Sequence, residues 1–307
     1  MLTTRAQPGR HLPPWRREVP EALFGAGLTL PALLVTIALL GYPLAYSFWI
    51  SLHRVTLGNS NWRFVGFDNY LAMLRDPLFT PSLGRTLWFA FLVTVFTTIG
   101  GLASALLLNQ DFRGRSIVRA LLILPWAISQ TMLALTFGWI FNSTFGPLNG
   151  LLFDLGVIDQ YVAWFASGDV VLNIIALAFV WSLIPFAALL FLGALQTVPE
   201  ELERAARVDG AGTVRRFFLI KLPWIRETVL IVVIIAALNG FLAFSPIYIL
   251  TGGGPGTDTY LLSWWGYRVG FVDLDLGRGA AIFYFMTLLI AVLAVVTVFA
   301  LGRKRDA

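Results

Sequence analysis

The chain has 307 residues, of which 58% are hydrophobic and only 13% are charged, with a formal net charge of +5 and no cysteine. So apolar a composition excludes an ordinary soluble globular protein and predicts a chain embedded in a lipid bilayer. The lack of cysteine excludes disulfides and thiolate metal sites.

Six stretches without a charged side chain are each longer than the ~20 apolar residues that cross the hydrocarbon core as a helix. They cover residues 22–52, 86–110, 120–153, 170–199, 228–257 and 279–302. The runs are continuous rather than alternating, which argues against a barrel, and backbone hydrogen bonds in lipid must then be made within helices. The sequence therefore predicts an all-α integral membrane protein, with a six-helix domain over residues 22–302 between tails of residues 1–21 and 303–307.

The positions of the basic residues predict the orientation of the chain. Most of the 22 Lys and Arg residues lie in the N-terminal tail, the second-to-third and fourth-to-fifth connections, and the C-terminal end. By the positive-inside rule these segments and both termini face the cytoplasm. The first apolar run is too long for the core of a signal peptide, so we expect it to be retained as a span, with Pro31 and Pro43 as kinks or ends.

Two segments on the predicted outer side have distinctive sequences. Residues 62–70 read W-R-F-V-G-F-D-N-Y, and residues 250–256 read L-T-G-G-G-P-G. Glycine and proline let the second segment leave a helix and turn sharply. For the first segment a scoop-shaped turn against the membrane surface is one interpretation, and an aromatic interfacial belt formed by Trp62, Phe64 and Tyr70 is the other.

Residues with catalytic chemistry are almost absent from the sequence. The two histidines are His11, in the tail, and His53, at the end of a span, and no Walker A sequence occurs. We therefore predict no catalytic residue, metal site or cofactor in this chain, and no ATP hydrolysis by it. Carboxylates are confined to loops and span ends, whereas a proton- or sodium-coupled carrier usually buries some ionisable groups at membrane depth.

Polar and aromatic side chains within the fourth and fifth predicted spans are candidates for a substrate path. They are Trp181, Ser182, Phe186, Asn239 and Phe244. An amide that can form hydrogen bonds, combined with an aromatic platform, suits the binding of a sugar. Each of these side chains taken alone is equally compatible with a contact between helices.

Residues 198–225 form a charged, amphipathic segment between two apolar runs, VPEELERAARVDGAGTVRRFFLIKLPWI. Thr197 and Glu200 are spaced like a capping box around Pro199, which predicts the start of a helix, and Gly210 predicts its end. A second helical pattern covers residues 213–223. One face of the first helix carries, at helical spacing, Leu202, Ala205, Ala206 and Asp209. Small side chains on this face permit close docking of another protein.

This segment resembles the EAA loop of the permease subunits of bacterial ATP-binding-cassette importers, P-x-E-L-x-E-A-A-x-x-D-G-A followed by I-x-L-P. One position departs from that pattern, because the glutamate of E-A-A is Arg204, with Glu203 beside it. Residues 62–70 and 250–256 resemble the G-x-x-N-Y and L-T-x-G-G-P elements of carbohydrate-type permeases. The chain is thus identified as similar to the inner-membrane permeases of binding-protein-dependent importers of the maltose, glycerol-phosphate and trehalose type.

The resemblance implies a type I permease fold and a coupling helix that docks in a groove of an ATP-binding subunit. The residues implied in coupling are Glu201, Leu202, Glu203, Arg204, Ala205, Ala206, Asp209 and Gly210. The implied partners are a second permease, two ATP-binding subunits that bind ATP and Mg²⁺, and an external solute-binding protein. The family's asparagine-rich stretch is here mostly Gly240, Leu242 and Ala243, so the contacts to solute differ or this subunit makes few. A secondary, ion-coupled transporter of a small polar solute and an inert membrane scaffold are the alternatives, and the sequence does not identify the solute.

Overall fold

The computed structural model describes residues 21–56, 58 and 62–302, so most of the predicted tails lie outside the described residues. The chain divides after Trp49 into two compact units. The first unit is one helical run in three parts, α1 (Glu21–Thr36), the π-helical turn η1 (Ile37–Gly41) and α2 (Tyr42–Ser51), the last of which ends in the second unit. Pro31 lies inside α1. The π-helical turn η1 directly precedes α2, which contains Pro43, and a proline ring disfavours the regular hydrogen bond from residue i to residue i−4.

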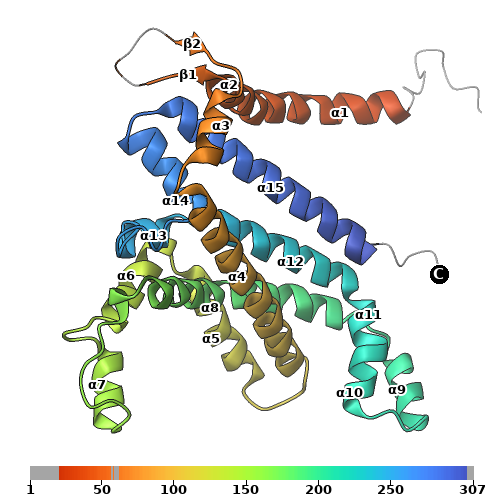
Figure 1. The fold of residues 1–307 in the computed structure, drawn as a ribbon. Coiled ribbons are helices and arrows are strands. Elements are labelled where there is room, and N and C mark those ends of the chain that lie inside the picture. Colours follow the sequence, from red (N-terminus) through yellow and green to blue (C-terminus); the bar gives the residue numbers. More distant parts are fainter. Residues whose placement is uncertain (1–20, 57, 59–61, 303–307) are drawn as a thin grey trace, which may run out of the picture. The chain divides into compact units, whose positions relative to one another are not determined.

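The second unit is helical apart from a two-stranded antiparallel ribbon, β1 (His53–Arg54) with β2 (Arg63–Phe64) (Figure 1). Its longer helices are α3 (Asp68–Arg75), α4 (Phe79–Leu108), α5 (Arg115–Ala127), α6 (Gln130–Ile140), α7 (Pro147–Asp154), α8 (Gly168–Leu195), α9 (Glu200–Val208), α12 (Arg226–Phe241) and α15 (Leu276–Gly302). The shorter turns and helices are η2 (Trp164–Ala166), α10 (Thr213–Arg216), η3 (Phe217–Lys221), α11 (Leu222–Trp224), α13 (Ser245–Leu250), α14 (Leu262–Tyr267) and η4 (Arg268–Val272).

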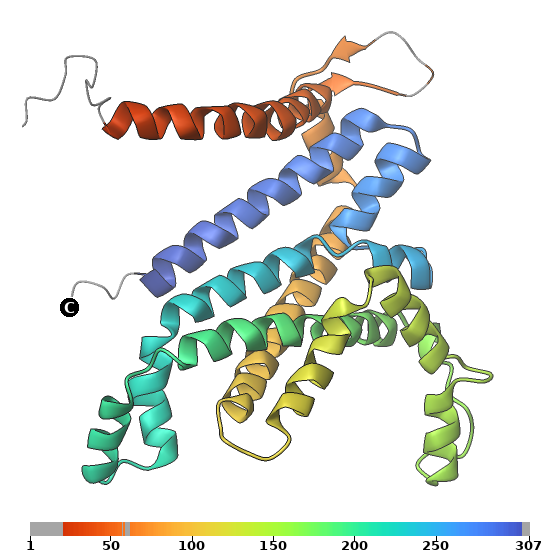
Figure 2. The same cartoon turned by 180° about the vertical axis from the view of Figure 1, so that it is seen from behind.

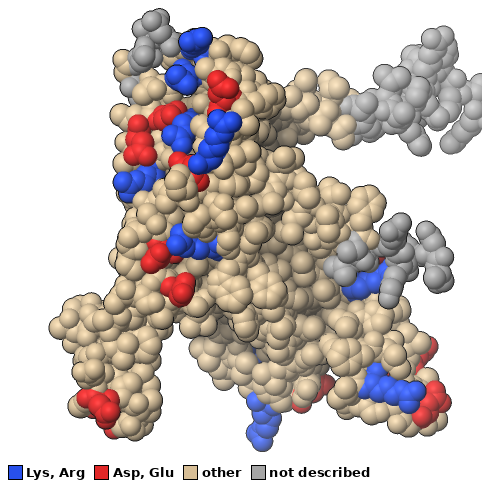
Figure 3. All heavy atoms as spheres, viewed as in Figure 1, with Lys and Arg blue, Asp and Glu red and all other residues tan. Residues whose placement is uncertain are grey.

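Five helical segments of the described chain are long and apolar enough to cross a membrane. They are Thr29–Ser51, Phe79–Leu108, Gly168–Leu195, Arg226–Leu250 and Leu276–Phe299. A sixth crossing exists if α5 and α6, which meet at an angle of 98°, are counted as one span. On the face seen in Figure 3, charged side chains gather over α9 and α10 and over β1, β2 and α3, whereas the surface between these regions is largely uncharged.

The third predicted span, residues 120–153, is wrong as a continuous helix. The chain bends between α5 and α6 because Ile128 leaves the helical conformation, and the side chain of Ser129 then caps α6 by accepting a hydrogen bond from the backbone N–H of Met132 at 3.3 Å. Pro125 lies in the last turn of α5, close to this break. Residues 141–153 belong instead to a turn and to α7, which begins at Pro147.

The core of the second unit lies where α8 crosses α4 (Figure 2). Small residues bring the two helices close together, since a Cβ placed on Gly101 of α4 would lie 2.5 Å from the Cβ of Ala187 of α8. Apolar side chains of both helices are fully buried there, among them Phe89 and Ile175. Because close backbone approach by small residues is the usual basis of helix association in lipid, the contact of α4 with α8 forms the frame on which α5, α6 and α12 pack.

The segment of residues 62–70 is fixed by hydrogen bonds. The buried side-chain amide of Asn69 donates to the carbonyl oxygens of Ser51 and His53, at 2.8 and 2.9 Å. The hydroxyl of Tyr70 lies 2.7 Å from that of Ser51, and burial raises the pKa of the Tyr70 phenol. Asn69 and Tyr70 therefore hold the ribbon against the start of α3, while Trp62 and Phe64 stay exposed, as an interfacial belt requires.

The glycine-rich segment of residues 250–256 forms the sharp turn that the sequence predicts. Gly253 has φ +96°, and a Cβ on it would collide with the rings of Tyr260 and Trp264, so this position requires glycine. Arg85 of α4 fixes the turn from the side, since its guanidinium donates to the carbonyl oxygen of Thr257 at 2.9 Å and pairs with Asp258 at 3.0 Å. The turn is thus tied to the same helix that forms the core.

Candidate functional site

The predicted coupling segment folds as two short helical stretches that run back on each other. Its first helix, α9, has three glutamates in its first turn and Arg207 in its last, which complements the helix dipole. The capping box expected from Thr197 is wrong. Pro199 is the N-cap residue, and the hydroxyl of Thr197 instead donates to the carbonyl of Ala194 at 2.8 Å and accepts from the indole N–H of Trp224 at 3.1 Å.

Gly210 ends the first helix, as the sequence predicts. Its φ is +76°, and the N–H of the next residue, Ala211, donates to the carbonyl oxygen of Ala206 at 2.9 Å, which closes the helix end. The chain then returns through α10, η3 and α11, a continuous helical stretch from Thr213 to Trp224 with a π turn in its middle. Helix, glycine turn and helix are therefore confirmed.

The free face of α9 carries small and medium-sized apolar side chains, with the exposed carboxylates of Glu201 and Asp209 at its two ends. Leu202 is 44% exposed and Val208 is 88% exposed, and Ala205, between them, is exposed as well. Ala206 lies toward the edge of this face and is partly covered. Val208 was not predicted from the sequence, although it lies three residues after Ala205 and therefore on the same side of the helix.

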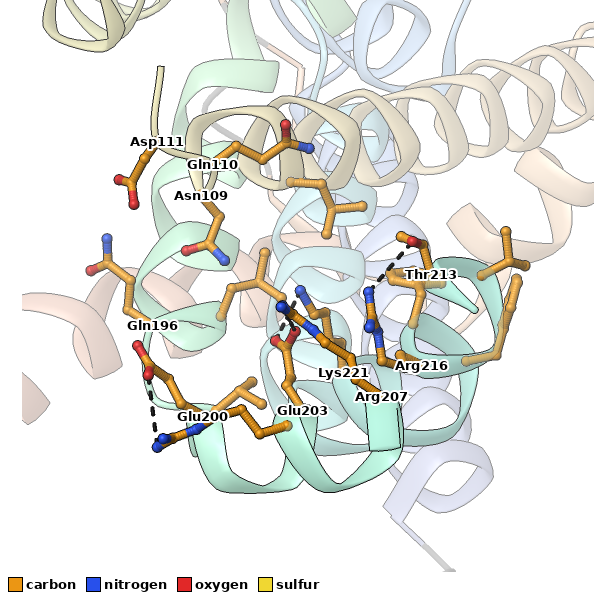
Figure 4. A pocket seen from close by; sticks show the side chains of 17 residues that line it. Asn109, Gln110, Asp111, Gln196, Glu200, Glu203, Arg207, Thr213, Arg216 and Lys221 are labelled. Atoms are coloured by element: carbon orange, nitrogen blue, oxygen red, sulfur yellow. Dashed lines mark hydrogen bonds and ion pairs between the residues drawn. The ribbon is translucent and has the colours of Figure 1, made fainter. Parts of the chain in front are cut away.

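The opposite face of α9 borders a hollow of about 900 Å³ between α9, η3 and the ends of α4 and α8 (Figure 4). Glu203 points into this space and pairs with Lys221 of η3, with Nζ and Oε1 3.0 Å apart. Arg204 lies nearer the rim, 67% exposed, and its nearest carboxylate is Glu200 at 4.0 Å. Of the two residues at the departure from the E-A-A pattern, Glu203 is thus directed inward, whereas Arg204 lies at the more exposed rim of the same hollow.

Two of the five predicted path residues meet in one place. Asn239 of α12 and Phe244, which precedes α13, line an open hollow of about 210 Å³. Gln130, the first residue of α6, lines the same hollow, and its buried side-chain oxygen has no hydrogen-bond partner among the described residues. The side-chain N–H of Asn239 donates to the carbonyl of Ile235 at 2.9 Å. Gln130 was not predicted from the sequence, because its only local signal is its position after Ser129.

The other three predicted path residues do not line this hollow. Ser182 is buried at 3% exposure, and its hydroxyl donates to the carbonyl of Phe179 at 2.8 Å within α8. Trp181 borders a separate apolar hollow beside α5. The ring of Phe186 packs against that of Trp126, with the ring centroids 5.8 Å apart. Among the described residues, no group of three or more His, Asp or Glu side chains is placed to hold a metal ion.

The sequence profile of the family described as binding-protein-dependent transport system inner membrane component matches residues 97–303, from the middle of α4 to the end of α15. The chain belongs to this family. It is 35% identical over 280 residues to the sulfoquinovosyl glycerol transport system permease protein SmoG of Agrobacterium fabrum, with 89% of each chain covered. It is 37% identical over 265 residues to the trehalose/maltose transport system permease protein MalF of Thermococcus litoralis, which covers 85% of this chain and 88% of MalF.

Solved structures agree in fold with these inner-membrane components. A chain of a bacterial ABC transporter that imports the acidic polysaccharide alginate superposes with a TM-score of 0.79 at 20% identity, covering 94% of this chain and 99% of that one. The protein is therefore a membrane-embedded permease component of a binding-protein-dependent transport system, and its family is one of transport components rather than of enzymes.

Proposed function

We propose that this chain is one permease subunit of an ATP-driven importer for a sugar or a sugar-like solute. The observation that carries the proposal is the exposed apolar face of α9, held on a glycine turn in a segment that fits the EAA pattern. The relatives named above transport sulfoquinovosyl glycerol and trehalose or maltose, which supports a carbohydrate-like solute. A second permease, two ATP-binding subunits and an external solute-binding protein complete the assembly.

The path hollow offers chemistry that suits a polyol. The unpartnered side-chain oxygen of Gln130 can accept a hydrogen bond from a solute hydroxyl, and the amide of Asn239 stands at the same hollow. Phe244 supplies the aromatic surface against which a sugar ring packs. Water satisfies such groups between transport events, so a solute that replaces this water with its own hydroxyls loses little hydrogen bonding on entry.

Transport in this proposal depends on movement that begins outside the bilayer. ATP binds with Mg²⁺ on the partner subunits, and closure of their dimer displaces α9, which lies in their groove. This chain hydrolyses no ATP and holds no cofactor. The displacement shifts the spans between inward- and outward-facing arrangements, which exposes the hollow between α6 and α12 alternately to the two sides of the membrane.

The proposed orientation, with both termini and α9 in the cytoplasm, predicts a labelling pattern. Because the chain has no cysteine, a single cysteine at Ser167, before α8, should react with an impermeant maleimide in intact cells, and one at Gly212, after α9, should react only after lysis. The 28 residues of α8 separate the two sides. The same contrast is expected between Ser60 and Asp306, which lie outside the described residues. The reverse pattern would contradict the orientation.

The proposed function is tested by uptake in proteoliposomes. The chain, co-expressed with the second permease and the ATP-binding subunit, should take up labelled solute only with ATP inside and with the loaded solute-binding protein outside. ATP hydrolysis should rise several-fold when the loaded binding protein is added. Uptake driven by an ion gradient without ATP would instead support the secondary transporter.

A further inference from the structure

The position of α9 depends on few contacts. None of its nine residues, all of them described, is buried. A helix this short is only marginally stable by itself, since isolated helices need about 12–15 residues or more. The hollow on its inner side leaves it without a packed base. Individual polar contacts between α9 and the returning stretch therefore decide where α9 lies.

One contact of this kind stands out by its length and its burial. The ammonium of Lys221 and the carboxylate of Glu203 are 3.0 Å apart, and the two side chains are only 20% and 19% exposed (Figure 4). Arg207, one turn along α9, adds a second, longer contact of 3.8 Å to the same carboxylate. The neighbouring pair of Glu200 with Arg204 differs in both respects, since its atoms are 4.0 Å apart and its side chains are 90% and 67% exposed. Exposed ion pairs of this kind contribute little to stability.

Lys221 is well placed to pass a displacement on to the membrane. It is the last residue of η3, and its carbonyl accepts a hydrogen bond from the N–H of Ile225 at 3.0 Å. Ile225 is 1% exposed and packs with Phe191 of α8 and Val232 of α12. The helix that begins at the next residue, α12, carries Asn239 at the path hollow.

We propose that the ion pair between Glu203 and Lys221 is the tie through which a displacement of α9 reaches α12. Both are positioning residues, and neither belongs to the exposed face that meets the ATP-binding subunit. The inference rests on the proposed function. It also bears on the departure from the E-A-A pattern at Arg204. The neighbouring Glu203 is paired with Lys221 within this chain, so its carboxylate is not available to hold α9 in the partner's groove.

Breaking the tie should uncouple the transporter without dissociating it. In the complete complex in proteoliposomes, Glu203→Gln and Lys221→Met should each lower the number of solute molecules taken up per ATP hydrolysed by about tenfold, a change equivalent to ~1.4 kcal/mol. The charge-exchanged double variant, Glu203→Lys with Lys221→Glu, should recover most of the loss. Glu200→Gln, in the exposed pair on the same helix, is the matched control and should change this ratio less than twofold.

Each other outcome contradicts the inference. An unchanged ratio in the single variants would mean that the pair carries no displacement, and loss of the ATP-binding subunit from those variants would place the pair in the docking contact instead. A charge-exchanged variant no better than the single variants would exclude a simple ionic tie. A wild-type complex that neither retains the ATP-binding subunit nor couples ATP to uptake would contradict the proposed function itself, which separates the two failures.

Discussion

Gly210→Val is expected to abolish uptake and solute-stimulated ATP hydrolysis while leaving membrane insertion normal. Gly210 has φ +76°, a conformation that a β-branched residue adopts only with strain of order 1–3 kcal/mol. No atom lies within 4 Å of a Cβ built at this position, so the cost is one of backbone conformation rather than of collision. The chain can relieve the strain by unwinding the end of α9, which misdirects α10 and removes Val208 from the exposed face.

Gly212→Val is the matched control for this variant. Gly212 lies two residues further along the same turn and is equally free of neighbours within 4 Å, but its φ of −64° is open to any residue. The measurements are retention of the ATP-binding subunit during purification and uptake in proteoliposomes. If Gly210→Val and Gly212→Val behave alike, the left-handed turn has no part in coupling.

The contrast between these glycines shows what the sequence can and cannot reveal about the coupling segment. Gly210 follows a helical pattern in the position of a helix C-cap, so its conformation could be predicted from local sequence. Thr197 misled the same reasoning, because its hydroxyl bonds to Trp224, 27 residues further on. The inward direction of Glu203 depends in the same way on Lys221, which local periodicity does not place. Contacts that depend on how the chain returns were therefore missed.

The membrane spans show the same difference between features that local sequence predicts and features that it does not. Runs without charge are read directly from the sequence, and five of the six predicted runs each coincide with a single span. The run of residues 120–153 carries no charged residue at its bend, although Ser129, Gln130 and Thr131 are polar. Pro125 and Ser129 were the available signals, a proline near a helix end followed by a capping residue.

The bend also explains why Gln130, at the hollow beside Asn239, escaped prediction. Asn239 is conspicuous as an amide within an apolar span, and Phe244 follows it closely in sequence. Gln130 joins them only because the chain turns by 98° before it, which brings the first residue of α6 to the start of α13. The three candidate residues of α8 lie outside this hollow. Helical spacing alone does not show which face of a buried helix is turned toward α12.

Asn239→Leu is expected to lower uptake by at least about tenfold while the complex stays assembled. Leucine has the same number of non-hydrogen side-chain atoms as asparagine, and the hollow beside Asn239 leaves room for its bulkier methyl groups, so packing of α12 changes little. The substitution removes the amide from the hollow shared with Gln130 and Phe244, and a polar solute then loses a hydrogen bond in a partly desolvated site, which costs about 1–3 kcal/mol. Uptake at saturating and at limiting concentrations of loaded binding protein measures the loss.

Asn173→Leu provides the control in a membrane span, because Asn173 of α8 accepts a hydrogen bond from Trp88 at 3.1 Å beside a different hollow. It should leave uptake unchanged if the requirement is for an amide at the path rather than for any amide within a span. Dissociation of the complex in Asn239→Leu would show instead that this side chain holds helices together. Undiminished uptake with an intact complex would remove Asn239 from the path altogether, and the solute would then have to be bound by the second permease.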